Sequence, residues 1–338
     1  MHPVDALERA TYYLDRELAP SSKVRAFQRA LDVVRELDAS ELADRAARGT
    51  LVELEGIGPS TAEVITDALH GVTDGYLARL DERTQVRVNG GASIRDALRG
   101  DCHLHTSWSD GAAPIRAMVD TALALGHEYL VVTDHSARLT IAHGLDETRL
   151  RRQLDEIAAL NGEVAPFRVL TGLEVDILDD GSLDLSQAML AGLDVVVASV
   201  HSKFRMPRDE MTRRMVLAIT NPHVDILGHC TNRKVAGTGR PGTQFDAEIV
   251  FAACHQFGTA VEINCRPERQ DPPEELLVLA VEWDCNIVIS TDAHSPGQME
   301  WQAFGCEKAE RCGVPVDRII NTWPADELTA WTATHRGI

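Results

Sequence analysis

The sequence lacks any hydrophobic run long enough to cross a lipid bilayer. The longest such run, LDVVVASV at 193–200, is far shorter than the ~20 residues that a membrane-spanning helix requires. The opening residues, MHPVDALERA, are polar and of mixed charge, which is not the composition of a signal peptide. We therefore expect a soluble, cytoplasmic protein.

Paired cysteines are also missing. The chain has seven cysteines, an odd number, and none of them forms a C-x-x-C motif. Cys230, Cys265 and Cys285 lie in apolar, strand-like segments. This distribution predicts reduced, buried thiols and argues against a disulfide framework or a structural zinc knuckle.

An excess of basic residues is absent as well. The formal net charge is -19, which argues against a broad basic face for nucleic acid. The deficit is uneven, because residues 1–100 hold 13 Lys and Arg against 17 Asp and Glu, whereas the remainder holds 20 against 35. A phosphorylated substrate is still compatible with this charge, since bound divalent cations would supply local positive charge.

The first part of the chain has the periodicity of amphipathic helices. Apolar residues three and four apart predict helices over 4–18, 23–37, 40–48 and 60–69. Ser22 is a candidate N-cap for the second helix. Residues 71–99 are less regular, and we place a domain boundary at 99/100, between a small all-helical domain (1–99) and a second domain (100–338).

After Gly100, short β-branched runs alternate with longer helical patterns. The predicted strands are 101–105, 129–135, 168–175, 195–201, 224–229, 260–264 and 286–292. Seven β units separated by helical segments indicate an α/β fold with a largely parallel sheet, whose strands are buried on both faces.

Histidines and carboxylates recur where these strands end. They are His103, His105, Asp110, Asp134, His135, Glu174, His201, His229, Glu262, Asn264, Asp292 and His294. The strand ends of a (β/α) barrel converge on one face, whereas an open sheet would spread them out, so their recurrence favours a closed (β/α)7 barrel. A single histidine at a strand end is more often structural, but six such histidines together predict a metal site.

The donor types indicate which metals and which chemistry to expect. In the His-x-His pair, His103 and His105 point to the same side of a strand. Imidazole with carboxylate suits zinc, manganese or iron, and so many donors imply two or three ions, with Glu174 as a bridging ligand. Such ions generate hydroxide near neutral pH and neutralise a phosphoryl group during attack. The chain has no G-x-S-x-G, Walker A or Rossmann motif that would suggest another chemistry.

Seven motifs resemble, in order, those of the PHP (polymerase and histidinol phosphatase) domain family. They are GDCHLHTSWSDG (100–111), VVTDHS (131–136), TGLEVDIL (171–178), ASVHSKF (198–204), ILGHCTNR (226–233), VEINCRPERQD (261–271) and ISTDAHSP (289–296). The resemblance implies a distorted (β/α)7 barrel and a trinuclear metal site. Its implied ligands are His103, His105, Asp110, His135, Glu174, His201, His229, Asp292 and His294. Some relatives use a histidine near the position of Asp110.

Within that family, the barrel is most similar to the C-terminal PHP domain of bacterial family X DNA polymerases. The resemblance implies a manganese-dependent 3′-5′ exonuclease with 3′-phosphatase and abasic-site activities. The sequence departs from the pattern in two ways. Residues 229–233 read HCTNR where relatives often have HPTGR, and residues 70–100 replace a whole polymerase palm and thumb without any Asp-x-Asp pair. We therefore expect no polymerase activity.

Basic residues in the same loops are candidates for substrate binding, because a guanidinium group binds phosphate bidentately. They are Arg233 and Arg240 in one loop, Arg266 and Arg269 in the next, and Lys203 after His201. Solvated surface arginine is the alternative for Arg240 and Arg266. The family pattern favours Arg233 and Arg269, which together with Glu174 form the predicted catalytic set.

The segment LEGIGPSTA (54–62) resembles the hairpin of a helix-hairpin-helix element. Gly56 and Gly58 permit a tight turn, and the helix that begins near Ser60 and Thr61 could present N–H groups to a DNA phosphate. Such a hairpin can also be a packing scaffold, and the acidic balance of residues 1–100 does not favour DNA affinity.

These observations predict a DNA-processing phosphoesterase that uses metal-activated hydroxide, with DNA as its partner and a separate polymerase or repair protein as a possible second partner. Two alternatives stay open. One is a small-molecule phosphomonoesterase, such as a histidinol-phosphate phosphatase. The other is a non-catalytic DNA-repair adaptor with a structural metal site.

Overall fold

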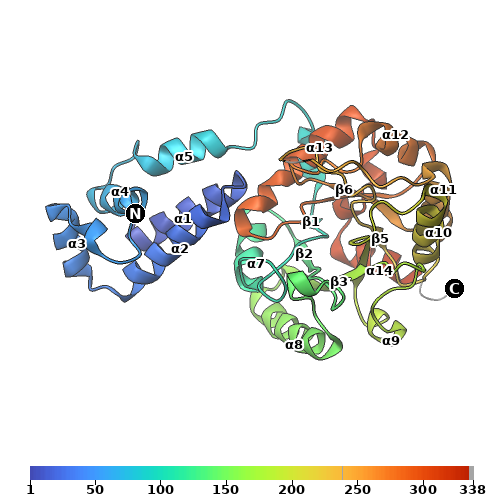
Figure 1. Ribbon diagram of the computed structural model, residues 1–338, viewed down its shortest axis with the longest axis horizontal. Coiled ribbons are helices and arrows are strands. Elements are labelled where there is room, and N and C mark those ends of the chain that lie inside the picture. The colour runs from blue at the N-terminus through green and yellow to red at the C-terminus, as the bar shows by residue number, and fades with distance from the viewer. Residues whose placement is uncertain (238, 335–338) are drawn as a thin grey trace. The chain divides into compact units, whose positions relative to one another are not determined.

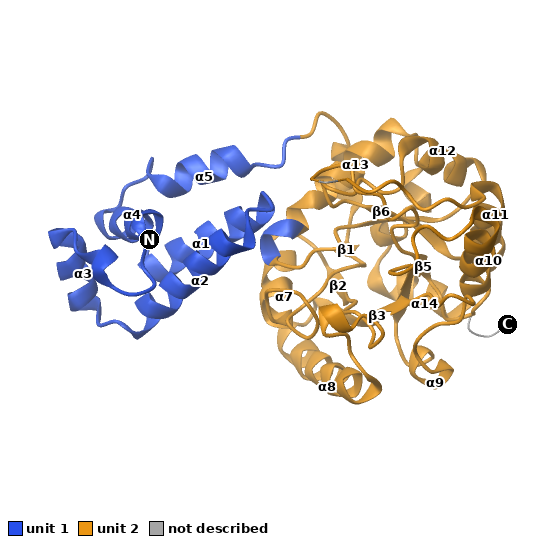
Figure 2. Ribbon diagram, in the orientation of Figure 1, with its two compact units in different colours: residues 1–87, 296–298 blue, residues 88–295, 299–338 orange. Residues whose placement is uncertain are grey.

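The computed structural model describes residues 1–237 and 239–334, which form two compact units (Figure 2). Unit 1 comprises residues 1–87 with 296–298, and unit 2 comprises residues 88–295 with the chain from 299 onward. The division at 87/88 precedes the expected boundary at 99/100, because α6 (Ala92–Ala97) packs on α13 (Gln302–Arg311) of the barrel unit.

Unit 1 is helical. Its elements are α1 (Pro3–Arg16), α2 (Ser21–Glu36), α3 (Ala39–Arg48), the 3-10 turn η1 (Leu51–Glu53), α4 (Pro59–His70) and α5 (Tyr76–Thr84). The four predicted helices are confirmed to within two residues at each end. Helices α5 and α6 were not predicted, and the prediction of Ser22 as the N-cap of the second helix was wrong, since α2 begins at Ser21 after Pro20.

Local signals and a shared core explain these helices. Asp38 caps α3 by accepting hydrogen bonds from the backbone N–H groups of Ser40 and Glu41. Gly49 ends α3 in the left-handed conformation, at φ +69°. The apolar faces of the helices meet in one cluster that includes the fully buried side chains of Leu14 and Ile65. The small unit therefore has a hydrophobic core of its own.

Unit 2 is built on seven strands, β1 (Gly100–Asp101), β2 (Tyr129–Val132), β3 (Arg168–Asp176), β4 (Val195–Ser199), β5 (Ile226–Leu227), β6 (Ala260–Asn264) and β7 (Ile287–Ser290). They pair in parallel in the order β1 to β7. Beyond the formal strand ends, Leu104 forms a parallel bridge with Ala293. This bridge joins the first strand to the last, so the predicted (β/α)7 barrel is confirmed.

Helices follow the strands and surround the barrel (Figure 1). They are α7 (Ile115–Ala124), α8 (Glu147–Val164), α9 (Gln187–Leu190), α10 (Arg208–Ile219), α11 (Ala247–Phe257), α12 (Glu274–Glu282), α13 and α14 (Ala325–Thr334), with short 3-10 segments at 140–142, 296–301, 316–318 and 320–322. None of the helices in the described residues is long and apolar enough to cross a membrane.

The barrel interior is a packed apolar core. Val131, Val197, Ile226 and Val288 are fully buried and belong to one cluster. A filled interior leaves the carboxyl ends of the strands as the face where polar side chains can gather. The seven cysteines are free, and six of them are buried, which confirms the prediction of reduced thiols.

Candidate metal centre

Glu174 on β3 lies at the centre of a group of imidazole rings. Its Oε2 is 2.8 Å from Nδ1 of His135 and 3.4 Å from Nε2 of His103. Its Oε1 is 2.9 Å from Nε2 of His229 and 3.2 Å from Nε2 of His201. The carboxylate is buried and sits among rings contributed by four different strand ends. This is the arrangement expected of a bridging carboxylate.

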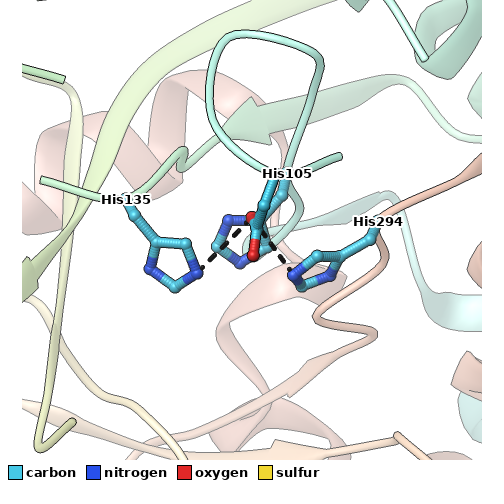
Figure 3. Close-up of side chains that lie close together, drawn as sticks. His105, His135 and His294 are labelled. Carbon is cyan, nitrogen blue, oxygen red and sulfur yellow. Dashed lines mark ion pairs between the residues drawn. The ribbon is translucent and has the colours of Figure 1, made fainter. Parts of the chain in front are cut away.

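A second group adjoins the first. Asp110 Oδ1 lies 3.6 Å from Nε2 of His135 and 3.4 Å from Nε2 of His294. Figure 3 shows the rings of His105, His135 and His294 facing one another, with the ion pairs drawn as dashed lines. Asp292 completes the group, because its Oδ1 is 3.3 Å from Nε2 of His105. All nine predicted ligands therefore meet in one place.

The cluster fits divalent metal ions better than it fits a network of protein hydrogen bonds. Nε2 of His103 and Nε2 of His105 face each other at 3.2 Å, and the donor atoms fall into three groups whose members lie within 4.8 Å of one another. Among the described residues, the buried atoms Nδ1 of His135, Nε2 of His201 and Oε2 of Glu174 have no partner with hydrogen-bond geometry. Because buried polar atoms normally have partners, this set of orphaned donors is best explained by cations.

The surroundings of Glu174 and His105 favour the ligand forms of these two residues. Burial alone would raise the pKa of Glu174, but His201, His103 and His135 hold it well below its usual value. Burial lowers the pKa of His105, and His294 and His135 lower it further. An ionised carboxylate beside a neutral imidazole is the state in which both can bind a cation.

Two carboxylates outside the predicted set hold ligand histidines by their other nitrogen. Glu262 on β6 lies 2.6 Å from Nδ1 of His103, and Asp176 on β3 lies 3.3 Å from Nδ1 of His201. Burial alone would lower the pKa of His201, but Glu174 and Asp176 raise it to about 9. Glu262 was visible in the sequence as a strand-end residue without an assigned role, whereas nothing in the sequence marked Asp176.

Asp134, another strand-end carboxylate, supports the backbone rather than the metal donors. It accepts hydrogen bonds from the hydroxyls of Thr106 and Ser109 and from Nε2 of Gln153. These bonds fix the loop that follows the His-x-His pair and carries Asp110. Asp134 thus positions a predicted ligand without being one of the donors.

The arginines of the β6 loop and its neighbour differ in their surroundings. Arg269 is largely buried, and its Nε lies 3.5 Å from Oδ2 of Asp292. Arg233 donates to the backbone carbonyls of Arg269 at 3.2 Å and Gln270 at 2.5 Å. Arg269 therefore places a positive charge beside the donor cluster. Arg233 instead joins the loop after β5 to the loop after β6.

Arg266 also has protein partners. Its Nη1 lies 2.9 Å from Nδ1 of His294, and its Nε donates to Glu268 at 2.8 Å. Lys203 forms an ion pair with Asp179. The guanidinium groups of Arg233 and Arg266 and the ammonium group of Lys203 are thus engaged with the protein. Arg240 also has protein contacts, but none of those in the described residues is to a carboxylate.

The predicted DNA hairpin lies in unit 1. Gly56 has φ +94°, a conformation that favours glycine. Gly58 precedes α4, and its N–H donates to Oγ1 of Thr61 at 2.9 Å. Thr61 is only 3% exposed, so its side chain stabilises the turn and cannot contact a ligand on the surface. Ser60 is exposed at the start of α4.

Comparison with known proteins connects the barrel to phosphoester chemistry. Residues 101–266 match the model of the PHP domain. The chain is 38% identical over 234 residues to the DNA polymerase/3′-5′ exonuclease PolX of Bacillus subtilis, covering 69% of this chain and 41% of that protein. It therefore spans less than half the length of that relative. It is 28% identical to a probable phosphatase of Thermoanaerobacter pseudethanolicus, covering 66% of this chain and 89% of that protein.

Two solved structures share part of the architecture. The histidinol phosphate phosphatase of Lactococcus lactis, solved with zinc, L-histidinol and phosphate, aligns with a TM-score of 0.47 at 19% identity, covering 64% of this chain and 92% of the other. A putative histidinol phosphatase of Listeria monocytogenes aligns with a TM-score of 0.47 at 15% identity, covering 59% and 97%.

Proposed function

Since residues 101–266 are a PHP domain, we propose that this chain is a metal-dependent phosphoesterase that hydrolyses phosphoester bonds in DNA, at a 3′ end or an abasic site. The observation that carries the proposal is the position of Glu174, a buried carboxylate within 3.4 Å of imidazole nitrogens from four histidines. A carboxylate and imidazoles with orphaned nitrogens are donors for two or three divalent ions.

The donor set divides into overlapping groups. Among the described residues, the donor atoms close enough together to hold one ion are those of His103, His105 and Glu174, those of His135, Glu174 and His201, and those of His105, Asp110, His135 and His294. Glu174 belongs to two of these groups and would be shared between them. When bound, such ions supply hydroxide at neutral pH and neutralise phosphoryl oxygens. The manganese, zinc and iron alternatives remain equally compatible with nitrogen and oxygen donors.

Arg269 is the residue best placed to steady the phosphate. Its guanidinium group is held beside Asp292, at the edge of the donor cluster. Burial alone would lower the pKa of Arg269, but Asp292 and Glu174 raise it, so the group stays charged. A charged, oriented guanidinium group stabilises the negative charge that develops on phosphoryl oxygens. We therefore retain Arg269 as a catalytic residue and assign Arg233 to loop structure.

Two features favour DNA as the substrate. One is the 38% identity to a relative named as a DNA polymerase and 3′-5′ exonuclease. The other is the hairpin of unit 1, where the exposed Ser60 lies in the first turn of α4 and the helix dipole favours a phosphate. Within this module Gly56 and Gly58 shape the turn, so the contact would come from the backbone and from Ser60.

A phosphomonoesterase is the second candidate, because the chain covers 89% of a relative named as a probable phosphatase. DNA hydrolysis and phosphomonoester hydrolysis would use the same metal centre. They would differ in the residues around the centre that contact the rest of the substrate. The adaptor hypothesis requires a centre without catalysis, which the complete donor set does not favour.

One assay series distinguishes these functions. Purified protein with manganese is offered 3′-phosphorylated, nicked, abasic and single-stranded DNA, and histidinol phosphate in parallel. DNA hydrolysis that disappears in His103→Ala supports the proposal. Hydrolysis of histidinol phosphate alone would overturn it, and metal binding without any hydrolysis would favour the adaptor.

A further inference from the structure

The loop after β5 forms a small hairpin beside the metal centre. The backbone N–H of Lys234 donates to the carbonyl of Arg240 at 2.8 Å, and the N–H of Arg240 donates back at 2.9 Å. The N–H of Val235 donates to the carbonyl of Glu268 in the β6 loop at 2.8 Å. These bonds fix the backbone positions of Lys234 and Arg240.

The guanidinium group of Arg240 lies over an aromatic ring. Its guanidinium carbon lies 4.1 Å from the ring centroid of Phe204, and its Nε donates to the carbonyl of Asn232 at 2.8 Å. Phe204 follows the ligand His201 by three residues, and Asn232 follows the ligand His229 by three. These two contacts hold the Arg240 guanidinium group between the loops that follow the ligands His201 and His229.

The two cations of this hairpin, Lys234 and Arg240, form no ion pair in the described part of the chain, although the carboxylates of Glu268 and Asp271 lie near enough to act on them. The chain as a whole carries a net charge of -19. Burial lowers the pKa of Lys234, and the neighbouring charges of Arg269 and Arg240 lower it further. Three positive groups thus lie close together, and their mutual repulsion would be relieved by an anion.

The positions of these cations suggest two anionic sites rather than one. Arg269 pairs with Asp292 at the donor cluster, where the reacting phosphate would lie. Lys234 is exposed on the hairpin outside the cluster, and Arg240 lies between the hairpin and Phe204. A small phosphomonoester has only one phosphate, which the metal centre and Arg269 would occupy. The hairpin cations would then have no ligand.

We propose that Lys234 and Arg240 bind a second phosphate of the substrate, the one next to the reacting phosphate in a nucleic-acid strand, with Phe204 positioning Arg240. The proposal rests on the proposed phosphoesterase function and narrows its substrate class to strands with at least two phosphates. It predicts that an oligonucleotide is preferred over a nucleotide ester with a single phosphate.

The test compares two substrates in the full-length protein with manganese. One is a fluorescein-labelled single-stranded oligonucleotide, and the other is the p-nitrophenyl ester of thymidine 5′-monophosphate, which has a single phosphodiester. In the double variant Lys234→Gln/Arg240→Gln, the ratio of kcat/KM for the oligonucleotide to kcat/KM for the ester should fall about tenfold or more. The salt dependence of the oligonucleotide reaction should also weaken, by a log–log slope of about one to two.

Three further variants separate the roles of these side chains. Arg213→Gln removes an exposed cation from α10, away from the hairpin, and should leave the ratio unchanged. Arg240→Lys keeps the charge without the planar group and should lower the ratio by a smaller factor, as should Phe204→Leu. Circular dichroism checks that each variant is folded. A ratio equal to that of wild type in the double variant would overturn the proposal.

A binding measurement separates failure of this inference from failure of the proposed function. Fluorescence anisotropy with a phosphorothioate copy of the oligonucleotide gives a dissociation constant whether or not DNA is hydrolysed. A constant raised about tenfold in the double variant supports the second-phosphate site. An unchanged constant refutes it. If the wild type binds the oligonucleotide but hydrolyses no DNA, the proposed function fails and the binding site stands.

Discussion

Glu262 and His103 form a buried carboxylate–imidazole pair, in which Oε1 of Glu262 lies 2.6 Å from Nδ1 of His103. The other oxygen, Oε2, accepts the backbone N–H of His229 at 2.6 Å. One carboxylate thus orients the ring of one metal-site histidine and the backbone of another. Such partners fix the tautomer and direction of a ligand histidine.

Replacing Glu262 by glutamine should therefore weaken metal binding. The amide keeps the shape of the side chain but loses its charge, so we expect Glu262→Gln to lower metal affinity roughly 10- to 100-fold. Competition with a fluorescent chelator measures the affinity. Glu282→Gln, an exposed glutamate at the end of α12, is the matched control and should bind metal like wild type. Equal affinity in the two variants would refute the role of Glu262.

A buried arginine holds the β3 and β4 loops together. Arg214 on α10 donates to the carbonyl of Leu178 at 2.9 Å and to the carbonyl of Ser202 at 3.0 Å. Arg214→Met would leave these part-buried carbonyls, and the buried carbonyl of Ile177, without this donor and should lower the free energy of unfolding by about 3 kcal/mol. Urea denaturation measures the loss. The adjacent Arg213→Met is exposed and should change stability by less than about 0.5 kcal/mol; a similar loss in both would contradict this account.

His127 should make the barrel sensitive to mild acid. Burial lowers the pKa of His127 from 6.5 to about 4, so the ring takes up a proton at a lower pH in the folded protein than in the unfolded chain. Stability from the neutral ring is present above pH 6.5 and is lost as the pH falls toward 4. Between pH 7 and 5 the loss should be about 1–2 kcal/mol. Unfolding curves at pH 7 and pH 5 give the loss of stability between the two. This loss should be smaller in His127→Gln than in wild type, and it should be the same as in wild type in His70→Gln, a change at an exposed site.

Thr61 should matter for stability rather than for DNA. Its buried hydroxyl accepts the N–H of Gly58 and donates to the carbonyl of the same residue. Thr61→Ala should lower the stability of the helical unit by about 1 kcal/mol, whereas the exposed Ser60→Ala should have little effect. Thermal unfolding followed by circular dichroism compares the two. A larger loss in Ser60→Ala would show that the hairpin is arranged differently.

Strand ends made much of the barrel and its donor cluster predictable. The pattern of apolar residues and the composition of the segments predicted the seven strands. Because strand ends converge in a barrel, residues distant in sequence, such as His103 and His294, were expected to lie together. The motif resemblance completed the ligand set. These inferences succeeded because they depend on the order of elements rather than on side-chain detail.

Other features depend on contacts that no sequence pattern encodes. The pairing of Asp176 with His201 follows from the register of β3 against β4. Arg233 was predicted to bind phosphate from its residue type and loop, but it donates hydrogen bonds to two backbone carbonyls of the neighbouring β6 loop. The helix α5 was not predicted because residues 71–99 lack a regular apolar pattern, although Leu80 packs into the helical core.

The central claim is that Glu174 and its histidines hold two or three ions on which hydrolysis depends. Metal content per chain, measured by inductively coupled plasma mass spectrometry during reconstitution of EDTA-treated protein with manganese or zinc, tests it most directly. We predict that phosphoester hydrolysis returns as the metal content rises to at least two ions per chain. We also predict that Glu174→Gln lowers both the metal content and the rate of hydrolysis. Full hydrolysis by metal-free protein, or saturation below two ions in the wild type, would contradict the account.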